Sequence, residues 1–151
     1  MKTKQIIEVL RSTPLTAQFS VESFSREIQL SRSRFYTIVK MEYGTTPECL
    51  IRRRRLECII EWIISYPEIS TKAKLLDLAK IGFFHDAKPL ISAFKLFLGE
   101  HPFQSRYRLL DSDDLFCSYN NIINKLWTGL PIEMLSDEHE TNIISQQFIT
   151  T

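Results

Sequence analysis

Residues 20–47 read SVESFSREIQLSRSRFYTIVKMEYGTTP, and this stretch decides the fold. Ser20 is placed to cap a helix, and Leu30–Ser31 interrupts the helical pattern before a second helix begins. Because Ser23 stands where a capping box needs Glu or Gln, a cap without the reciprocal bond is expected. Apolar residues recur at helical spacing on both sides of the interruption: Phe24, Ile28, Phe35, Ile38 and Val39. The stretch therefore predicts a helix, a tight turn and a second helix that ends at Gly44.

The same pattern returns in residues 78–106, LAKIGFFHDAKPLISAFKLFLGEHPFQSR. Gly82 interrupts one apolar run, and His85–Asp86 precedes the next. Between the two copies, Pro47 opens a longer helix that is expected to end near Ser65. Its apolar residues are expected on one side, and at least two guanidinium groups of the run Arg52 to Arg55 on the other. The chain has only 4 glycines and 6 prolines and almost no alternating apolar runs, so an all-α fold is expected.

Taken together, residues 20–108 resemble the double helix–turn–helix DNA-binding domain of the AraC/XylS transcription regulators. The first copy matches the family pattern at Phe24–Ser25, Leu30–Ser31, Phe35, Val39–Lys40, Gly44 and Pro47, followed by Arg55–Leu56 on the linker helix. The second copy matches at Leu78–Ala79, Phe84, Asp86, Leu90, Phe94–Lys95, Gly99, Pro102 and Arg106. Two such copies in order, spaced by one helix, are far more specific than either copy alone.

Four positions depart from the family pattern. Phe83, not Gly82, aligns with the family's turn glycine, so either the turn shifts by one residue or Phe83 takes a left-handed backbone. Pro89 falls near the start of the second reading helix, where the first turn tolerates proline. Thr37 replaces a frequent arginine and Ser105 replaces a tyrosine.

The resemblance implies two helix–turn–helix subdomains joined by a linker helix, to which the sequence adds a C-terminal amphipathic helix. It divides the chain into an N-terminal extension (1–19), the double helix–turn–helix domain (20–110) and an acidic C-terminal extension (111–151). The implied function is sequence-specific regulation of transcription at promoters, by a bacterial, cytoplasmic factor that binds double-stranded DNA and recruits RNA polymerase. Because about nineteen residues precede Ser20, a stand-alone regulator without an effector domain is expected.

Base reading is expected from the N-terminal exposed faces of the two reading helices, because an α-helix fits the major groove. The base-reading candidates are Arg32, Ser33, Tyr36 and Thr37 on the first helix, and Ala87, Lys88, Ile91 and Ser92 on the second. Flanking cations are expected to contact phosphates. These phosphate-contact candidates are Lys40, Arg52, Arg53, Arg54, Arg55 and Lys95. The alternative for the arginine run is a solvated face or salt bridges to Glu48, Glu57 and Glu61 at helical spacing.

The charge is unevenly distributed along the chain, although the total is only +1. Residues 20–110 hold fifteen Lys/Arg against ten Asp/Glu, whereas residues 111–151 hold one lysine against seven acids. The acidic segment opens with an apolar stripe at helical spacing, with a cap at Ser112 or Asp113. Its members are Leu115, Tyr119, Ile122, Ile123, Leu126 and Leu130. The stripe is either extra core or a surface for a homodimer or protein partner. The partner surface supports a second hypothesis, a DNA-binding-defective relative that modulates another regulator by protein contact.

Other function classes receive little support from the sequence. His85, His101 and His139 lie in no constellation for a zinc site or a catalytic base, so neither metal, cofactor nor enzyme activity is expected, and capping or surface roles are favoured for them. The longest apolar stretch is short and carries Glu61, so no membrane span is expected, and the first ten residues do not resemble a signal peptide. Three unpaired cysteines, Cys49, Cys58 and Cys117, indicate free buried thiols in a reducing compartment.

Overall fold

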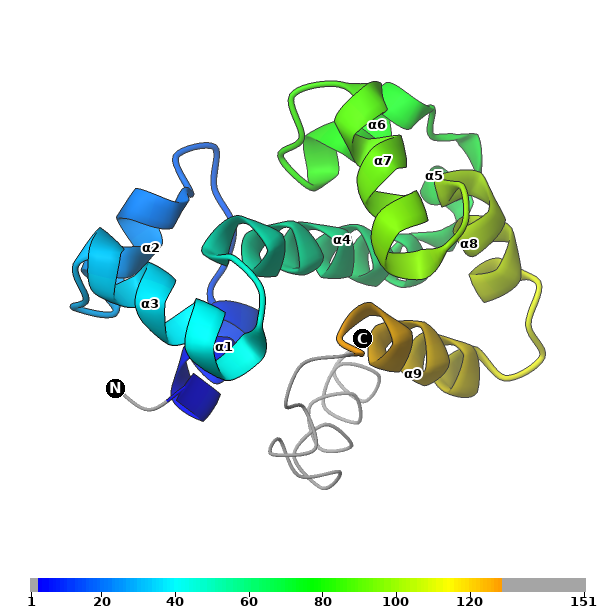
Figure 1. The fold of residues 1–151 in the computed structure, drawn as a ribbon. Coiled ribbons are helices and arrows are strands. Elements are labelled where there is room, and N and C mark those ends of the chain that lie inside the picture. Colours follow the sequence, from blue (N-terminus) through cyan, green and yellow to red (C-terminus); the bar gives the residue numbers. More distant parts are fainter. Residues whose placement is uncertain (1–2, 129–151) are drawn as a thin grey trace.

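A computed structural model of the protein describes residues 3–128, with side chains from residue 5 onward. The described chain is all-α, as the sequence predicted, and contains no strand. Its helices, drawn in Figure 1, are α1 (Thr3–Ser12), α2 (Val21–Glu27), α3 (Arg32–Tyr43), α4 (Pro47–Ser65), α5 (Pro67–Lys72), α6 (Leu75–Ile81), α7 (Ala87–Leu98), α8 (Pro102–Leu110) and α9 (Leu115–Leu126). Among residues 3–128, none of the helices combines the length and the hydropathy needed to cross a bilayer.

Helix α4 lies at the centre of the fold and packs against every other described helix. The Thr46 side chain accepts a hydrogen bond from the backbone N–H of Cys49, and Pro47 occupies the first turn, as the sequence predicted. Helices α1, α2 and α3 gather at the N-terminal end of α4, and α5 to α8 at its C-terminal end (Figure 1). Because neighbours surround it, α4 buries Arg54 and Glu57 together with the apolar residues of its predicted face.

The pairs α2–α3 and α6–α7 are joined by turns of the same geometry. The backbone N–H of Leu30 donates to the Ser25 carbonyl at 2.9 Å, and that of Phe84 donates to the Ala79 carbonyl at 2.8 Å. Each turn passes through one residue in the left-handed region, Gln29 at φ 61° and Phe83 at φ 59°. Both pairs thus end their first helix with a Schellman-type turn that uses a residue other than glycine.

Close packing against α4 explains why the glycine of the second turn stands one residue early. A Cβ on Gly82 would lie 2.5 Å from Cδ1 of buried Ile59 and 3.1 Å from the Arg55 carbonyl oxygen. Gly82 has φ −91°, so conformation does not require a glycine here, but space does. Of the two alternatives left open by the sequence, the second holds: Phe83 takes the left-handed backbone.

Local capping also differs from the sequence prediction in two places. The Ser23 hydroxyl accepts a hydrogen bond from the Ser20 N–H at 2.8 Å, so a capping box is present without Glu or Gln. The Asp114 carboxylate, rather than Ser112 or Asp113, caps α9 by accepting from the Cys117 N–H. These substitutions work because a short oxygen-bearing side chain at the right position satisfies the same unpaired N–H group.

Helix α9 is part of the core and not a partner surface. Its side chains Tyr119, Ile122, Ile123 and Leu126 are at most 6% exposed, and the helix packs against α4, α7 and α8. Leu115 is half-buried, and Leu130 lies outside the described residues. The homodimer or partner surface predicted on this stripe is therefore wrong for its buried members, which complete the chain's own core.

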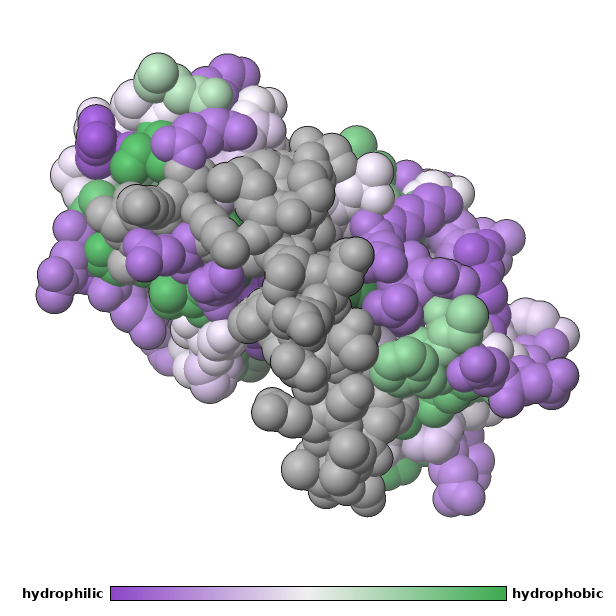
Figure 2. All heavy atoms as spheres, turned by 90° about the horizontal axis from the view of Figure 1, so that it is seen from below, coloured by the Kyte–Doolittle hydropathy of each residue, from purple (hydrophilic) through white to green (hydrophobic). Residues whose placement is uncertain are grey.

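One buried cluster connects the three sequence segments. It includes Ile6, Ile7 and Leu10 of α1, the apolar residues of α4, and the buried stripe of α9. The predicted boundaries at residues 19 and 110 mark where the family resemblance begins and ends, but the buried core continues across both of them. Seen from below, the described surface is mainly hydrophilic, with small hydrophobic areas between charged side chains (Figure 2).

Replacing Gly82 with alanine should destabilise the fold by about 1–3 kcal/mol, the usual cost of adding a methyl group to a packed core. Ile59→Val alone should cost about 0.5–1.5 kcal/mol, but it removes the Cδ1 atom nearest the new Cβ. The double variant should therefore lose less stability than the two single variants together. Urea denaturation of the four proteins measures this coupling, and strict additivity would contradict the proposed contact.

Candidate nucleic-acid interface

The first predicted reading helix, α3, presents a polar face to solvent. Its N-cap Ser31 accepts a hydrogen bond from the Arg34 N–H, while Phe35, Ile38 and Val39 anchor the opposite face in the core. This anchoring sets the exposure of all four base-reading candidates. Arg32, Ser33 and Thr37 are exposed, and Tyr36 is half-buried.

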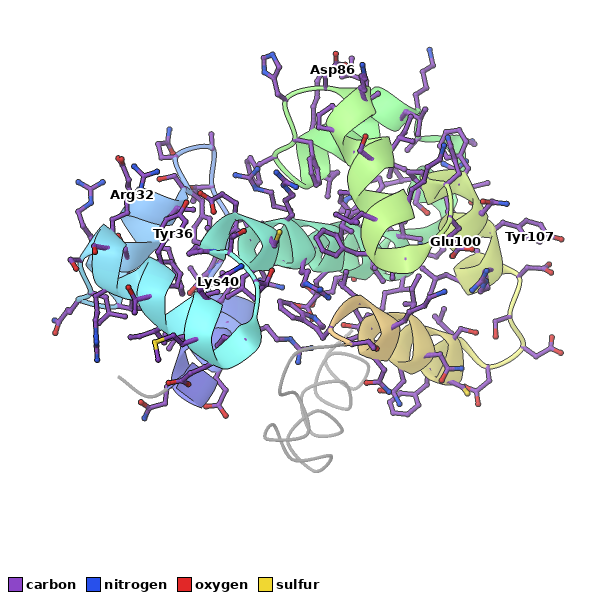
Figure 3. All side chains as sticks on the ribbon, in the orientation of Figure 1. Arg32, Tyr36, Lys40, Asp86, Glu100 and Tyr107 are labelled. Carbon is purple, nitrogen blue, oxygen red and sulfur yellow. The ribbon has the colours of Figure 1, made fainter. Side chains whose placement is uncertain are left out.

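Contacts between these side chains leave most of their hydrogen-bonding groups accessible. Arg32 pairs with Glu22 at 3.2 Å and lies 5.8 Å from the centre of the Tyr36 ring. Both charged partners are exposed, so this pair contributes little to stability and exchanges readily for another anion. The Thr37 hydroxyl donates to the Ser33 carbonyl, which leaves its methyl group and oxygen lone pair for recognition. Figure 3 shows Arg32, Tyr36 and Lys40 in order along α3.

The second predicted reading helix, α7, begins after Asp86, whose carboxylate accepts from the Ala87 N–H at 2.7 Å. Lys88 and Ser92 are exposed, whereas Ala87 and Ile91 are half-buried. Pro89 lies in the first turn, and α7 continues through it. The helix thus offers an exposed lysine and a hydroxyl for recognition, and its remaining two candidates present only aliphatic side chains.

The arginine run on α4 separates into four different environments. Arg52 is exposed, and no ion pair or hydrogen bond of its side chain occurs within residues 3–128. Arg53 donates to the Leu126 carbonyl at the end of α9, and its guanidinium lies 4.5 Å from the Phe97 ring centre. Arg54 is 7% exposed and pairs with Glu57 at 2.8 Å. Arg55 is half-buried and donates to the Phe19 carbonyl.

These environments correct the predicted phosphate contacts. Arg54 is wrong as a phosphate candidate, because its buried guanidinium pairs with Glu57. Arg53 and Arg55 are half-buried and each donates to a backbone carbonyl, and their phosphate contacts stay predictions. The pairing with Glu57 and Glu61 that the sequence allowed is present at Arg54. Lys40 and Lys95 are exposed, each near the end of its reading helix, and neither forms an ion pair in the described part of the chain.

A buried charge cluster, which the sequence analysis missed, joins α1, α4 and α9. Oε2 of Glu57 accepts hydrogen bonds from Arg11 at 2.7 Å and from Trp127 Nε1 at 3.1 Å, and Oε1 accepts from Arg54. Glu61 lies 3.7 Å from Arg54 and accepts from the Tyr119 hydroxyl. Burial opposes the charge of Arg54, but the adjacent Glu57 carboxylate raises its pKa. The i,i+3 spacing of Arg54 and Glu57 is the only local signal, because Arg11 and Trp127 are distant in sequence.

The histidines and cysteines form no second site in the described residues. Nδ1 of His101 accepts from the Phe103 N–H and caps α8, as favoured from the sequence, and His139 lies outside the described residues. All three cysteines are free, but Cys117 is exposed and Cys49 and Cys58 are only half-buried, so the expectation of buried thiols is wrong for Cys117 and holds only in part for the other two. Burial raises the pKa of the Cys58 thiol to about 11. Within residues 3–128, no three metal-ligating side chains gather.

Comparison of the chain with protein-family models, with curated proteins and with solved structures finds no match. The candidate interface therefore rests on its own geometry: two short-turn helix pairs at the ends of α4, each presenting the exposed face of its second helix.

Replacing Arg54 with alanine should destabilise the protein by about 3–5 kcal/mol, because Glu57 and Glu61 would lose a buried partner. Arg52→Ala removes the same charge from an exposed position two residues away and should change stability by less than about 0.5 kcal/mol. Chemical denaturation of both variants measures the difference. Equal stabilities would show that Arg54 does not have the structural role assigned to it.

Proposed function

We propose that this chain is a sequence-specific DNA-binding transcriptional regulator of the AraC/XylS double helix–turn–helix type, acting at promoters through α3 and α7. The observation that supports this most is the duplicated geometry. Two helix pairs share one turn geometry, and a single helix holds them at its two ends.

The length of α4, the helix that joins the two helix pairs, is of the same order as one turn of B-DNA. Helix α4 has 19 residues and extends about 28 Å at 1.5 Å per residue. One turn of B-DNA brings the major groove back to the same face after about 34 Å. In Figure 3, Arg32 and Asp86, at the N-terminal ends of α3 and α7, lie toward the upper side of the view, whereas α9 lies below α4. We propose that DNA lies along this upper side.

The surface chemistry supports DNA as the partner. Lys40 on α3, Arg52 on α4, and Lys88 and Lys95 on α7 are exposed cations without an ion pair in the described chain. Such cations gain by displacing the counterions that surround DNA phosphates. Recruitment of RNA polymerase belongs to the same proposal, through the family resemblance alone. The protein-contact alternative loses its main support, because the stripe of α9 is buried in the core.

A duplex selected from random sequence should bind the full-length protein, and binding should weaken as salt rises from about 50 to 200 mM, because each phosphate contact contributes about −0.9 to the slope of log K against log salt. Mobility-shift titrations at several salt concentrations measure this slope. Absence of any bound duplex at the lowest salt concentration, with the protein folded by circular dichroism, would refute the proposal.

The two reading helices should contribute unequally to base discrimination. Arg32→Ala or Ser33→Ala should relax preference at individual base pairs by about 1–3 kcal/mol, because both side chains can hydrogen-bond to base edges. Lys88→Ala should weaken binding about equally for all duplexes.

Binding of each variant to single-base-substituted duplexes distinguishes these effects. Lys125→Ala is the matched control, because Lys125 is an exposed cation that belongs to α9 and not to a predicted reading helix. Loss of base preference in Lys88→Ala, with preference intact in Arg32→Ala and Ser33→Ala, would reverse the assignment.

A further inference from the structure

A pocket of about 510 Å³ lies between α4 and the beginning of α7, next to the second reading helix. Its polar lining comes from Arg52 and Arg55 on α4, His85 just before α7, and Lys88 and Ser92 on α7. Pro89, Ala93 and Leu96 form an apolar wall. The pocket thus brings cations from two helices, distant in sequence, around one hollow.

The charge of this pocket is unbalanced. Arg52, Arg55 and Lys88 line it, and no carboxylate does. Burial and the neighbouring Arg52 charge both lower the pKa of Arg55, so an anion placed here would relieve the repulsion between the two guanidinium groups. Asp86, the nearest acid in sequence, caps α7 through the Ala87 N–H and does not line the pocket.

Contacts within the fold position the guanidinium of Arg55, the more buried of the two arginines in the pocket. Arg55 donates to the Phe19 carbonyl at 3.3 Å and lies 6.0 Å from the Phe84 ring centre. Its Nε atom is buried and has no hydrogen-bond partner in the structure. Because Phe19 directly precedes the cap of α2, Arg55 also connects the pocket to the first helix pair. The pocket itself lies between α4 and the second helix pair, and no residue of α2 or α3 lines it.

We propose that this pocket binds a phosphodiester of the DNA backbone where it passes between the two major grooves read by α3 and α7. Guanidinium and ammonium groups are the donors that proteins use for phosphate, and the apolar wall suits the carbon face of the adjoining deoxyribose. A free phosphate ester shares the phosphoryl chemistry and is the competing source. The inference rests on the proposed function, because it places DNA on the side of α4 that exposes Arg52 and Lys88.

Arg52→Ala and Lys88→Ala should each weaken binding of the selected duplex about fivefold at 0.15 M salt and reduce the salt slope by about 0.9. Lys125→Ala removes the same charge elsewhere and should bind like the wild type. A duplex with single neutral methylphosphonates, scanned across the region between the two contacted grooves, then locates the phosphate. At one position, the methylphosphonate should lower the affinity of the wild-type protein. The same methylphosphonate should not further lower the affinity of the Arg52→Ala/Lys88→Ala protein, which already lacks the contact.

Each remaining outcome overturns the inference in a distinguishable way. Wild-type affinity and salt slope in Arg52→Ala/Lys88→Ala would exclude the pocket while leaving DNA binding, and therefore the proposed function, intact. The pocket is also excluded if the methylphosphonate lowers the affinity of the wild-type and the double-variant protein equally. If the wild-type protein binds no duplex, the proposed function fails as well. Backbone-amide NMR with inorganic phosphate then tests the free source: shifts around Lys88 that the double variant lacks would assign the pocket to a free phosphoryl ligand.

Discussion

The carboxylate of Glu57 is the constraint on which the rest of the structure depends. It is 1% exposed and accepts hydrogen bonds from Arg11 of α1, Arg54 of α4 and Trp127 at the end of α9. A charge buried to this extent is tolerated only where partners and hydrogen bonds surround it. Three helices from the beginning, middle and end of the described chain must therefore meet at one point, and this meeting makes α4 a fixed axis instead of a flexible connection.

A fixed axis matters for the proposed function, because two reading helices recognise one duplex only when their separation and orientation match it. Arg53 strengthens the arrangement by bonding to the Leu126 carbonyl at the end of α9 and lying over Phe97 of α7. The adjacent arginines thus have different roles. Arg53 and Arg54 bond to other groups of the fold, while Arg52 and Arg55 line the pocket between α4 and α7.

The two helix pairs are similar in backbone geometry and different in chemistry. Both turns pass through one left-handed residue, Gln29 or Phe83. The connection between α6 and α7 is one residue longer than that between α2 and α3. Its glycine, Gly82, is required by close packing against Ile59 and not by the backbone conformation of the turn. The exposed face of α3 is richer in hydrogen-bond donors than that of α7, which instead borders the cationic pocket. If the proposed function holds, this difference predicts base reading mainly at α3 and backbone contact mainly near α7.

The sequence by itself determined the helical class, the two short-turn pairs, the cap at Ser20, and the exposed face that holds Arg32, Ser33 and Thr37, because caps, turns and apolar periodicity are local properties. It did not determine which of the four arginines remain at the surface. Only the tertiary structure decided that, because the partners of Arg53 and Arg54 include Leu126, on a distant helix, and Glu57, whose burial depends on Arg11 and Trp127. It likewise assigned the stripe of α9 to the core, because an apolar face is identical in sequence whether its own chain or another covers it.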